Sequence, residues 1–167
     1  LDEMLDADYN LGEFATEMSL VPPDTVAKAT VVSVKPIKYR DKETGDWNGM
    51  VEMIYRIDDQ EVKESTKLDD PRVVHTFRVD LDPAIIKNWD GEGPLPLASG
   101  PNKNIELGKV REAFGMNTGK PWRLSHFQNE QAYIRVARNT REGDQYARVS
   151  AVGSAREKME NLYARRK

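Results

Sequence analysis

The chain has 167 residues and a formal net charge of −3, and its 38% hydrophobic and 32% charged content suits one polar globular domain. Cysteine is absent, which excludes disulfides and thiolate metal sites, and no apolar run approaches the ~20 residues of a membrane helix. The acidic start LDEMLDADYN lacks the basic segment of a secretory signal, so we expect a cytoplasmic protein.

Charge is distributed unevenly along the chain. Residues 1–24 hold seven acidic residues and no basic one, which leaves 21 acidic and 25 basic residues in the rest. An acidic arm on a basic body is typical of proteins with nucleic-acid partners, although such an arm also serves solubility alone. Residues 1–21 are therefore expected to form an N-terminal arm, which Pro22 and Pro23 separate from the domain.

Two strands are expected next. Residues 25–34 are rich in β-branched side chains, which predicts a strand that Pro36 ends or bends. Residues 40–49 are charged and rich in turn formers, so they are expected to be a loop, and this loop contains Trp47. Residues 50–57 predict the second strand.

The middle of the chain predicts a third strand and two helices. Residues 58–71 lack apolar periodicity and are expected to be a long loop or ragged hairpin, whereas residues 73–81 alternate like a half-buried strand. A short helix is expected over 82–89, a loop over 91–104 and a helix over 105–114. The side chains expected to share the inward face of the third strand are Val73, His75, Phe77, Val79 and Leu81.

The last part of the domain predicts a hairpin. Residues 131–138 and 146–152 alternate as strands, and we expect the turn near Glu142-Gly143. A terminal helix is expected after this hairpin. The predicted fold is mainly β, a five-stranded OB-like barrel with a helix between strands 3 and 4. Its parts are the arm 1–21, the barrel domain 22–153 and the C-terminal helix or tail 154–167.

No catalytic constellation is present in the sequence. His75 and His126 are far apart, and the chain has no recognisable nucleophile or nucleotide-binding motif. Asp80 and Asp82 are spaced as a magnesium pair in a nuclease would be, but a solvent-facing strand residue and a helix cap explain them better. We therefore expect no enzyme activity, no cofactor and no metal.

The last hairpin carries the features that point to binding. If its turn centres near Glu142-Gly143, Tyr133 and Arg135 share a face with Tyr146 and Arg148. Tyrosine rings can stack on bases, and guanidinium groups can meet phosphates. The alternative is that these are ordinary side chains of an exposed strand face, where both types are common. The other candidate contacts are Lys28, Lys35, Lys38, Tyr39, Arg40, Trp47, Arg56, Arg78 and Arg138.

Three stretches of the chain resemble a known family. They are VPPDTVAKATVVSVKPIKYRDKETGDWNGMVEMIYRI, NIELGKVREAFGM and SHFQNEQAYIRVARNTREGDQYARVSAVGSA. Together they resemble the single-stranded DNA-binding proteins of tailed bacteriophages, over roughly Val21 to Ala155. The resemblance implies an OB fold and sequence-tolerant binding of single-stranded DNA during phage replication and recombination, in the host cell cytoplasm. Members often end in an acidic tail, whereas this sequence ends in Arg165-Arg166-Lys167.

The sequence leaves two other function classes open, a protein–protein module and a structural virion component. The arm carries apolar side chains among its acids, so the chain could instead be a protein–protein module, such as a phage adaptor or an inhibitor of a host protein. In the DNA-binding interpretation the same arm could recruit replication or recombination proteins. Monomer and homo-oligomer both stay open, and no membrane partner is expected.

Overall fold

The computed structural model describes residues 2–9, 12–13 and 19–165, and their fold is mainly β. The strands are β1 (Val26–Arg40), β2 (Trp47–Ile57), β3 (Arg72–Val79), β4 (Gln131–Arg141) and β5 (Asp144–Gly153). The helices are α1 (Asp2–Leu5), α2 (Gln60–Thr66), α3 (Pro83–Ile86), α4 (Ile105–Ala113), the 3₁₀ helix η1 (Leu124–Phe127) and α5 (Arg156–Arg165). No helix within the described ranges is long and apolar enough to cross a membrane.

The five strands form a mixed sheet that closes in a ring in the order β1-β2-β3-β5-β4. All neighbouring strands are antiparallel except β3 and β5, which are parallel and share the single register pair Val74–Arg148. The helix α4 lies between β3 and β4 in the chain, as expected. This arrangement is compatible with an OB-like fold.

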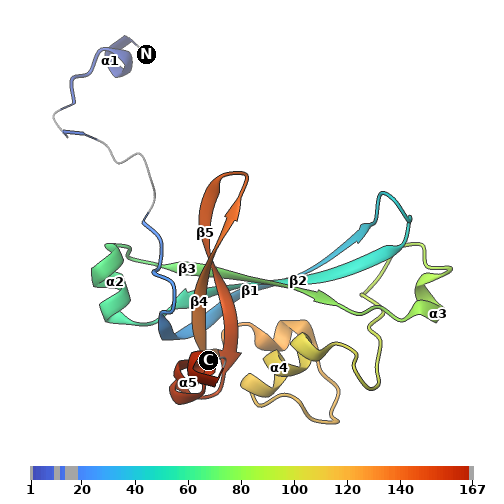
Figure 1. Ribbon diagram of the computed structural model, residues 1–167. Helices are drawn as coiled ribbons and strands as arrows, with labels where there is room; N and C mark the ends of the chain where they lie inside the picture. Colours follow the sequence, from blue (N-terminus) through green and yellow to red (C-terminus); the bar gives the residue numbers. More distant parts are fainter. Residues whose placement is uncertain (1, 10–11, 14–18, 166–167) are drawn as a thin grey trace.

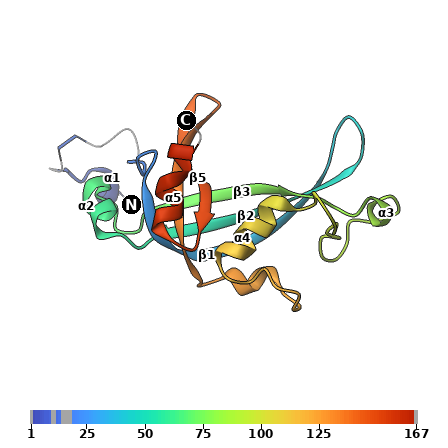
Figure 2. The ribbon, with the colours of Figure 1, turned by 60° about the horizontal axis from the view of Figure 1, so that its bottom comes forward.

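The elements are arranged around the long strands β1 to β3 (Figure 1). Helices α2 and α3 lie at opposite ends of these strands in both views (Figures 1 and 2). The β1–β2 and β4–β5 hairpins both project toward the same side in Figure 1, while α4 and α5 lie on the other side. Any ligand that contacts both hairpins would therefore lie across β2 and β3.

The core follows the alternation of the strands. In β2 every second residue from Val51 to Ile57 is buried, and β3 alternates in the same way. Val73, His75, Phe77 and Val79 are buried as predicted, and Leu81 is partly buried against the core just beyond the strand. Fully buried apolar side chains of this kind supply most of the stabilisation of a small domain.

The first hairpin is longer than the sequence predicts. β1 continues through Pro36 to Arg40, and Trp47 lies within β2 and not in a loop. Pro36 is tolerated because β1 pairs with β4 only through Thr30, so beyond that residue β1 has a sheet neighbour on one side only. β1 is irregular at a point before Pro36, where its register with β2 shifts between Val31 and Ser33.

The helices differ from expectation at several places: η1 was not predicted, and α3 ends at Ile86 although the expected helix runs to residue 89. The expected loop 58–71 contains α2, which begins where the Asp59 carboxylate accepts hydrogen bonds from the backbone N–H groups of Glu61 and Val62. Only Val62 and Thr66 of this short helix are buried, so its apolar periodicity was too brief to detect. Asp82 does cap α3 as predicted, and Leu107 and Val110 are the buried side chains expected of α4.

The β4–β5 hairpin turns at Glu142 and Gly143 as predicted, and both residues have positive φ angles, 52° and 86°. Ala132, Ile134 and Val136 point inward, also as predicted. A register shift between Arg135 and Val136 was not foreseen. Strict alternation along residues 146–152 predicts that Ala151 points inward with Ala147 and Val149. Because of this bulge Ala151 instead lies opposite Arg135, so that prediction is wrong.

Candidate functional site

Strand pairing brings six of the predicted contact residues onto one outer face of the sheet. Directly paired residues point to the same side, so each register pair extends this face by one strand. Lys35 of β1 lies opposite Glu52 of β2, and Glu52 in turn lies opposite Thr76 of β3. In the same way Arg56 of β2 lies opposite Arg72 of β3. We call this the outer face of β1-β2-β3-β5. The predicted contact residues on it are Lys35, Tyr39, Arg56, Arg78, Tyr146 and Arg148.

The outer face is predominantly basic. It carries Lys35, Arg56, Arg72, Arg78 and Arg148 against the acids Glu52 and Asp144 on the strands. Arg56 and Arg72 are already paired with Asp58 and Asp70, at 3.2 and 2.9 Å. Within the described part of the chain, the other three basic side chains have no carboxylate within ion-pair distance.

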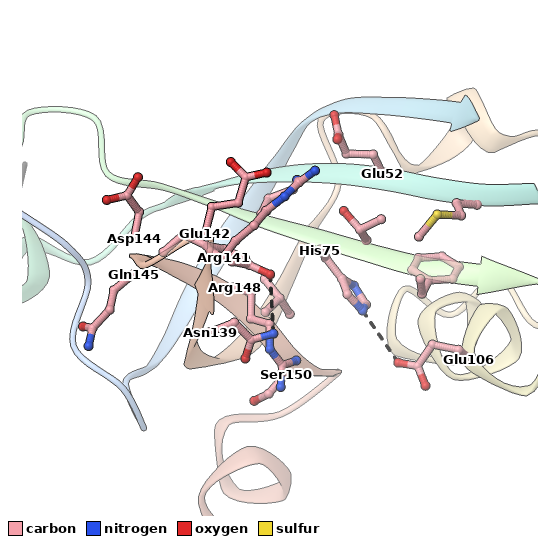
Figure 3. A pocket seen from close by; sticks show the side chains of 16 residues that line it. Glu52, His75, Glu106, Asn139, Arg141, Glu142, Asp144, Gln145, Arg148 and Ser150 are labelled. Carbon is pink, nitrogen blue, oxygen red and sulfur yellow. Dashed lines mark hydrogen bonds and ion pairs between the residues drawn. The ribbon is translucent and has the colours of Figure 1, made fainter. Parts of the chain in front are cut away.

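A cleft of about 960 Å³ opens at one side of the outer face, between β3 and β5 (Figure 3). It exists because these strands share only one register pair, so they separate on both sides of Val74 and Arg148. Apolar side chains of β3 and β5 contribute walls, and the β4–β5 turn and α4 contribute charged groups. Its polar lining includes Glu52, His75, Glu106, Asn139, Arg141, Tyr146 and Arg148.

His75 is the most enclosed polar residue of the cleft. His75 is 5% exposed, and its ring lies against the rings of Tyr55 and Phe77. Its Nε2 atom faces the Glu106 carboxylate at 3.7 Å, which is a longer contact than a hydrogen bond. This neighbour holds the pKa of Glu106 below its usual range, and partial burial of the carboxyl opposes the effect.

Two buried polar atoms of the cleft lack a partner among the described residues. They are Nδ1 of His75 and Nε of Arg148. Buried polar atoms without a hydrogen bond are uncommon in folded proteins because they forfeit the water they had in the unfolded chain. Both atoms are enclosed by the protein, and each could still gain one hydrogen bond from a group bound deep in the cleft.

A second set of predicted contacts lies on the opposite face of the β1–β2 hairpin. Lys38, Arg40 and Trp47 pack against the segment that follows β3. The Arg40 guanidinium lies 4.6 Å from the Trp47 ring centroid, and the Trp47 and Trp89 rings meet edge to face at 5.0 Å. The indole N–H of Trp47 also donates to the Trp89 carbonyl. These side chains anchor the hairpin and do not join the outer face.

A third set lies beside the C-terminal helix. Lys28 pairs with Tyr133 in register, and Arg156 of α5 lies 5.4 Å from the Tyr133 ring centroid. Arg135 donates to the Met159 carbonyl at 2.7 Å and pairs with Asp24 at 2.9 Å. Arg148 and Tyr146 lie opposite Ala137 and Asn139, which alternate with Tyr133 and Arg135 along β4, so the four side chains share a face as predicted. Contacts from α5 nevertheless occupy Tyr133 and Arg135.

The remaining predicted contact, Arg138, is exposed on the other face of the β4–β5 hairpin, opposite Ala147. Sequence reasoning missed several cleft residues, including Asn139, Glu52 and Glu106. Strand parity could have placed Glu52 beside Lys35. Nothing in the sequence pattern could have placed α4 at the seam between β3 and β5.

The described residues contain no group of three or more His, Asp or Glu side chains arranged to hold a metal ion. The side chains of the outer face can stack on rings, form hydrogen bonds and pair with charges. Comparison of the sequence with protein-family models and with curated proteins finds no match.

Proposed function

We propose that this protein is an OB-like domain that binds single-stranded DNA in a sequence-tolerant way, along the outer face of β1-β2-β3-β5. The observation that carries the proposal is the register, which gathers Lys35, Arg78 and Arg148 on one face together with Tyr39 and Tyr146. Basic groups can neutralise phosphates, and rings can stack on bases of any sequence. No catalytic step belongs to this proposal.

Several further features support it. The strand order and the helix between β3 and β4 suit an OB fold, in which strands 2 and 3 and the flanking hairpin loops bind oligonucleotides. Here both hairpins project beside β2 and β3 (Figure 1). The body of the chain is also basic once the acidic arm is set aside. In a phage such a protein would coat strands exposed during replication and recombination in the host cytoplasm.

The two tyrosines of the last hairpin differ in their surroundings, and this difference provides a test of the proposal. Tyr146 lines the open cleft, whereas Tyr133 lies against Arg156. We expect Tyr146→Ala to weaken binding to labelled oligo(dT) by roughly 5- to 100-fold, since one stacked base is worth ~1–3 kcal/mol. Arg78→Ala should weaken binding and reduce its salt dependence. Tyr133→Ala is the matched control and should bind as the parent does.

The measurement is fluorescence anisotropy at low and high salt, with circular dichroism to check that each variant folds. Binding of the parent protein should fall steeply with salt. A parent that does not bind oligo(dT) at low salt would remove the proposal. Unchanged affinity in both the Tyr146 and Arg78 variants would remove the proposed surface.

A second candidate function is a protein–protein module that docks through the N-terminal arm. Met4, Leu5 and Tyr9 are 77%, 81% and 73% exposed in an acidic segment, and exposed apolar side chains of this kind can dock onto a partner. In the DNA-binding proposal this arm would recruit replication or recombination proteins. Full DNA affinity in a chain lacking the arm would separate the two functions.

A further inference from the structure

The seam between β3 and β5 carries polar groups that base stacking and phosphate contacts alone do not explain. His75 is buried with Nδ1 unpartnered, and Nε of Arg148 is buried and unpartnered in the same cleft. A phosphate inside this cleft would meet an unfavourable charge, because the cleft is lined by Glu52, Glu106, Glu142 and Asp144 against Arg141 and Arg148. We therefore expect the phosphates to lie outside it, at Lys35 and Arg78. A neutral group with both donors and acceptors suits this lining better.

The hydrogen-bonding capacity of each lining residue specifies which donors and acceptors the neutral ligand must present. Arg148 can only donate, so the ligand must present acceptors to it. The Glu106 carboxylate can only accept, and so can Nδ1 of His75 when the ring is neutral with its proton on Nε2, facing Glu106. The ligand must therefore present donors to these two residues. Apolar walls from Val74 and Val149 suit a flat ring.

Among the DNA bases, guanine offers this combination most fully. Its N7 and O6 atoms are adjacent acceptors that an arginine commonly binds, and its N2 amino group is a donor. We propose that the β3–β5 seam is a pocket for one guanine base of the bound strand, with Arg148 on its acceptor side and Glu106 and His75 on its donor side. This inference rests on the proposed function, and it adds a base preference at one position of an otherwise tolerant site.

The experiment compares labelled oligo(dT) with the same oligonucleotide carrying one central dG, again by anisotropy. We expect the dG to tighten binding roughly tenfold. Replacing it with deoxyinosine, which lacks the N2 amino group, or with 7-deaza-dG, which lacks N7, should each remove a large part of the gain. Equal affinity for oligo(dT) with and without dG would overturn the pocket and leave the proposed function standing.

Substitutions of single residues test which side chains form the guanine pocket. Glu106→Gln should abolish the preference for dG while binding to plain oligo(dT) is kept, because this side chain lies at the cleft and off the strand face. His75→Phe should do the same if it folds, and Glu106→Gln alone decides the test if it does not. Glu112→Gln is the matched control on α4, because Glu112 is an exposed residue of the same type that does not line this cleft. An undiminished preference in Glu106→Gln would overturn the assignment.

A second readout does not depend on strand binding. Guanosine added to isotope-labelled protein should shift the ring signals of His75 in an NMR spectrum, and adenosine should not. Shifts with guanosine in a protein that fails to bind oligo(dT) would keep the pocket and remove the proposed function. Shifts with a basic peptide and none with guanosine would show that the acidic seam takes a cationic side chain, which would overturn the base pocket.

Discussion

At the scale of single residues, the contact between His75 and Glu106 links the core to the cleft. His75 is buried on β3 and Glu106 is half-buried on α4, so the contact also ties the helix to the sheet. The lowered pKa of Glu106 means that the folded state favours its ionised form. A carboxyl of this kind adds stability above its unfolded pKa, and that stability is lost as pH falls through the lowered folded value.

We predict that Glu106→Gln reduces stability at neutral pH by less than about 1 kcal/mol, since water still screens the half-buried carboxylate. The difference between variant and parent should shrink below pH 4.5, the ordinary value for the group, as the parent carboxyl becomes protonated. Urea unfolding between pH 7 and pH 3 measures this. A difference that stays constant over the whole range would show that the charge of Glu106 contributes nothing.

At the scale of elements, α5 decides which part of the sheet is accessible. Its Met159 is 4% exposed, and a Cβ added at Gly153 would lie 2.5 Å from the Met159 methyl. Its Arg156 donates to the Val26 carbonyl at 3.0 Å and lies over Tyr133. The helix is therefore docked by both apolar and polar contacts against β1, β4 and β5.

We predict that Met159→Ala destabilises the fold by about 2 kcal/mol, toward the low end for buried methionines because a terminal helix can readjust. Lys158→Ala, an exposed neighbour on the same helix, should stay within about 0.5 kcal/mol of the parent. Chemical denaturation monitored by circular dichroism compares them. If the two variants are equally stable, α5 does not dock as described.

At the scale of the whole molecule, charge is divided between the arm and the body. Removing residues 1–20 deletes six acidic residues and no basic one, which changes the formal net charge from −3 to +3. Long-range attraction of a polyanion depends on this balance and is screened by salt. If the outer face binds DNA as proposed, the arm is expected to oppose that binding without having to touch this face.

We predict that deletion of residues 1–20 leaves the affinity for oligo(dT) unchanged or raises it, with the largest gain at low salt. Anisotropy titrations of the full and shortened chains at two salt concentrations test this. The shortened chain should keep its fold, because the first core residue, Val21, is retained. A large loss of affinity would mean that the arm itself contacts DNA.

Much of the fold could be predicted because its signals are local. The alternation of residues 73–79 and 132–136 reports which side chains are buried, since successive side chains of a strand point to opposite faces. The Asp82 cap and the Glu142-Gly143 turn are likewise local backbone requirements. The helix α2 was missed because it buries only two side chains.

The sequence by itself determined the strands, their inward faces and the acidic arm, because these depend on residues a few positions apart. Only the tertiary structure decided which aromatic and basic residues are accessible together. Strand closure placed Tyr146 and Arg148 beside β3, whereas α5 covered Tyr133 and Arg135. A bulge, a ring closure and a docked helix each depend on contacts between distant segments, and no local periodicity records such contacts.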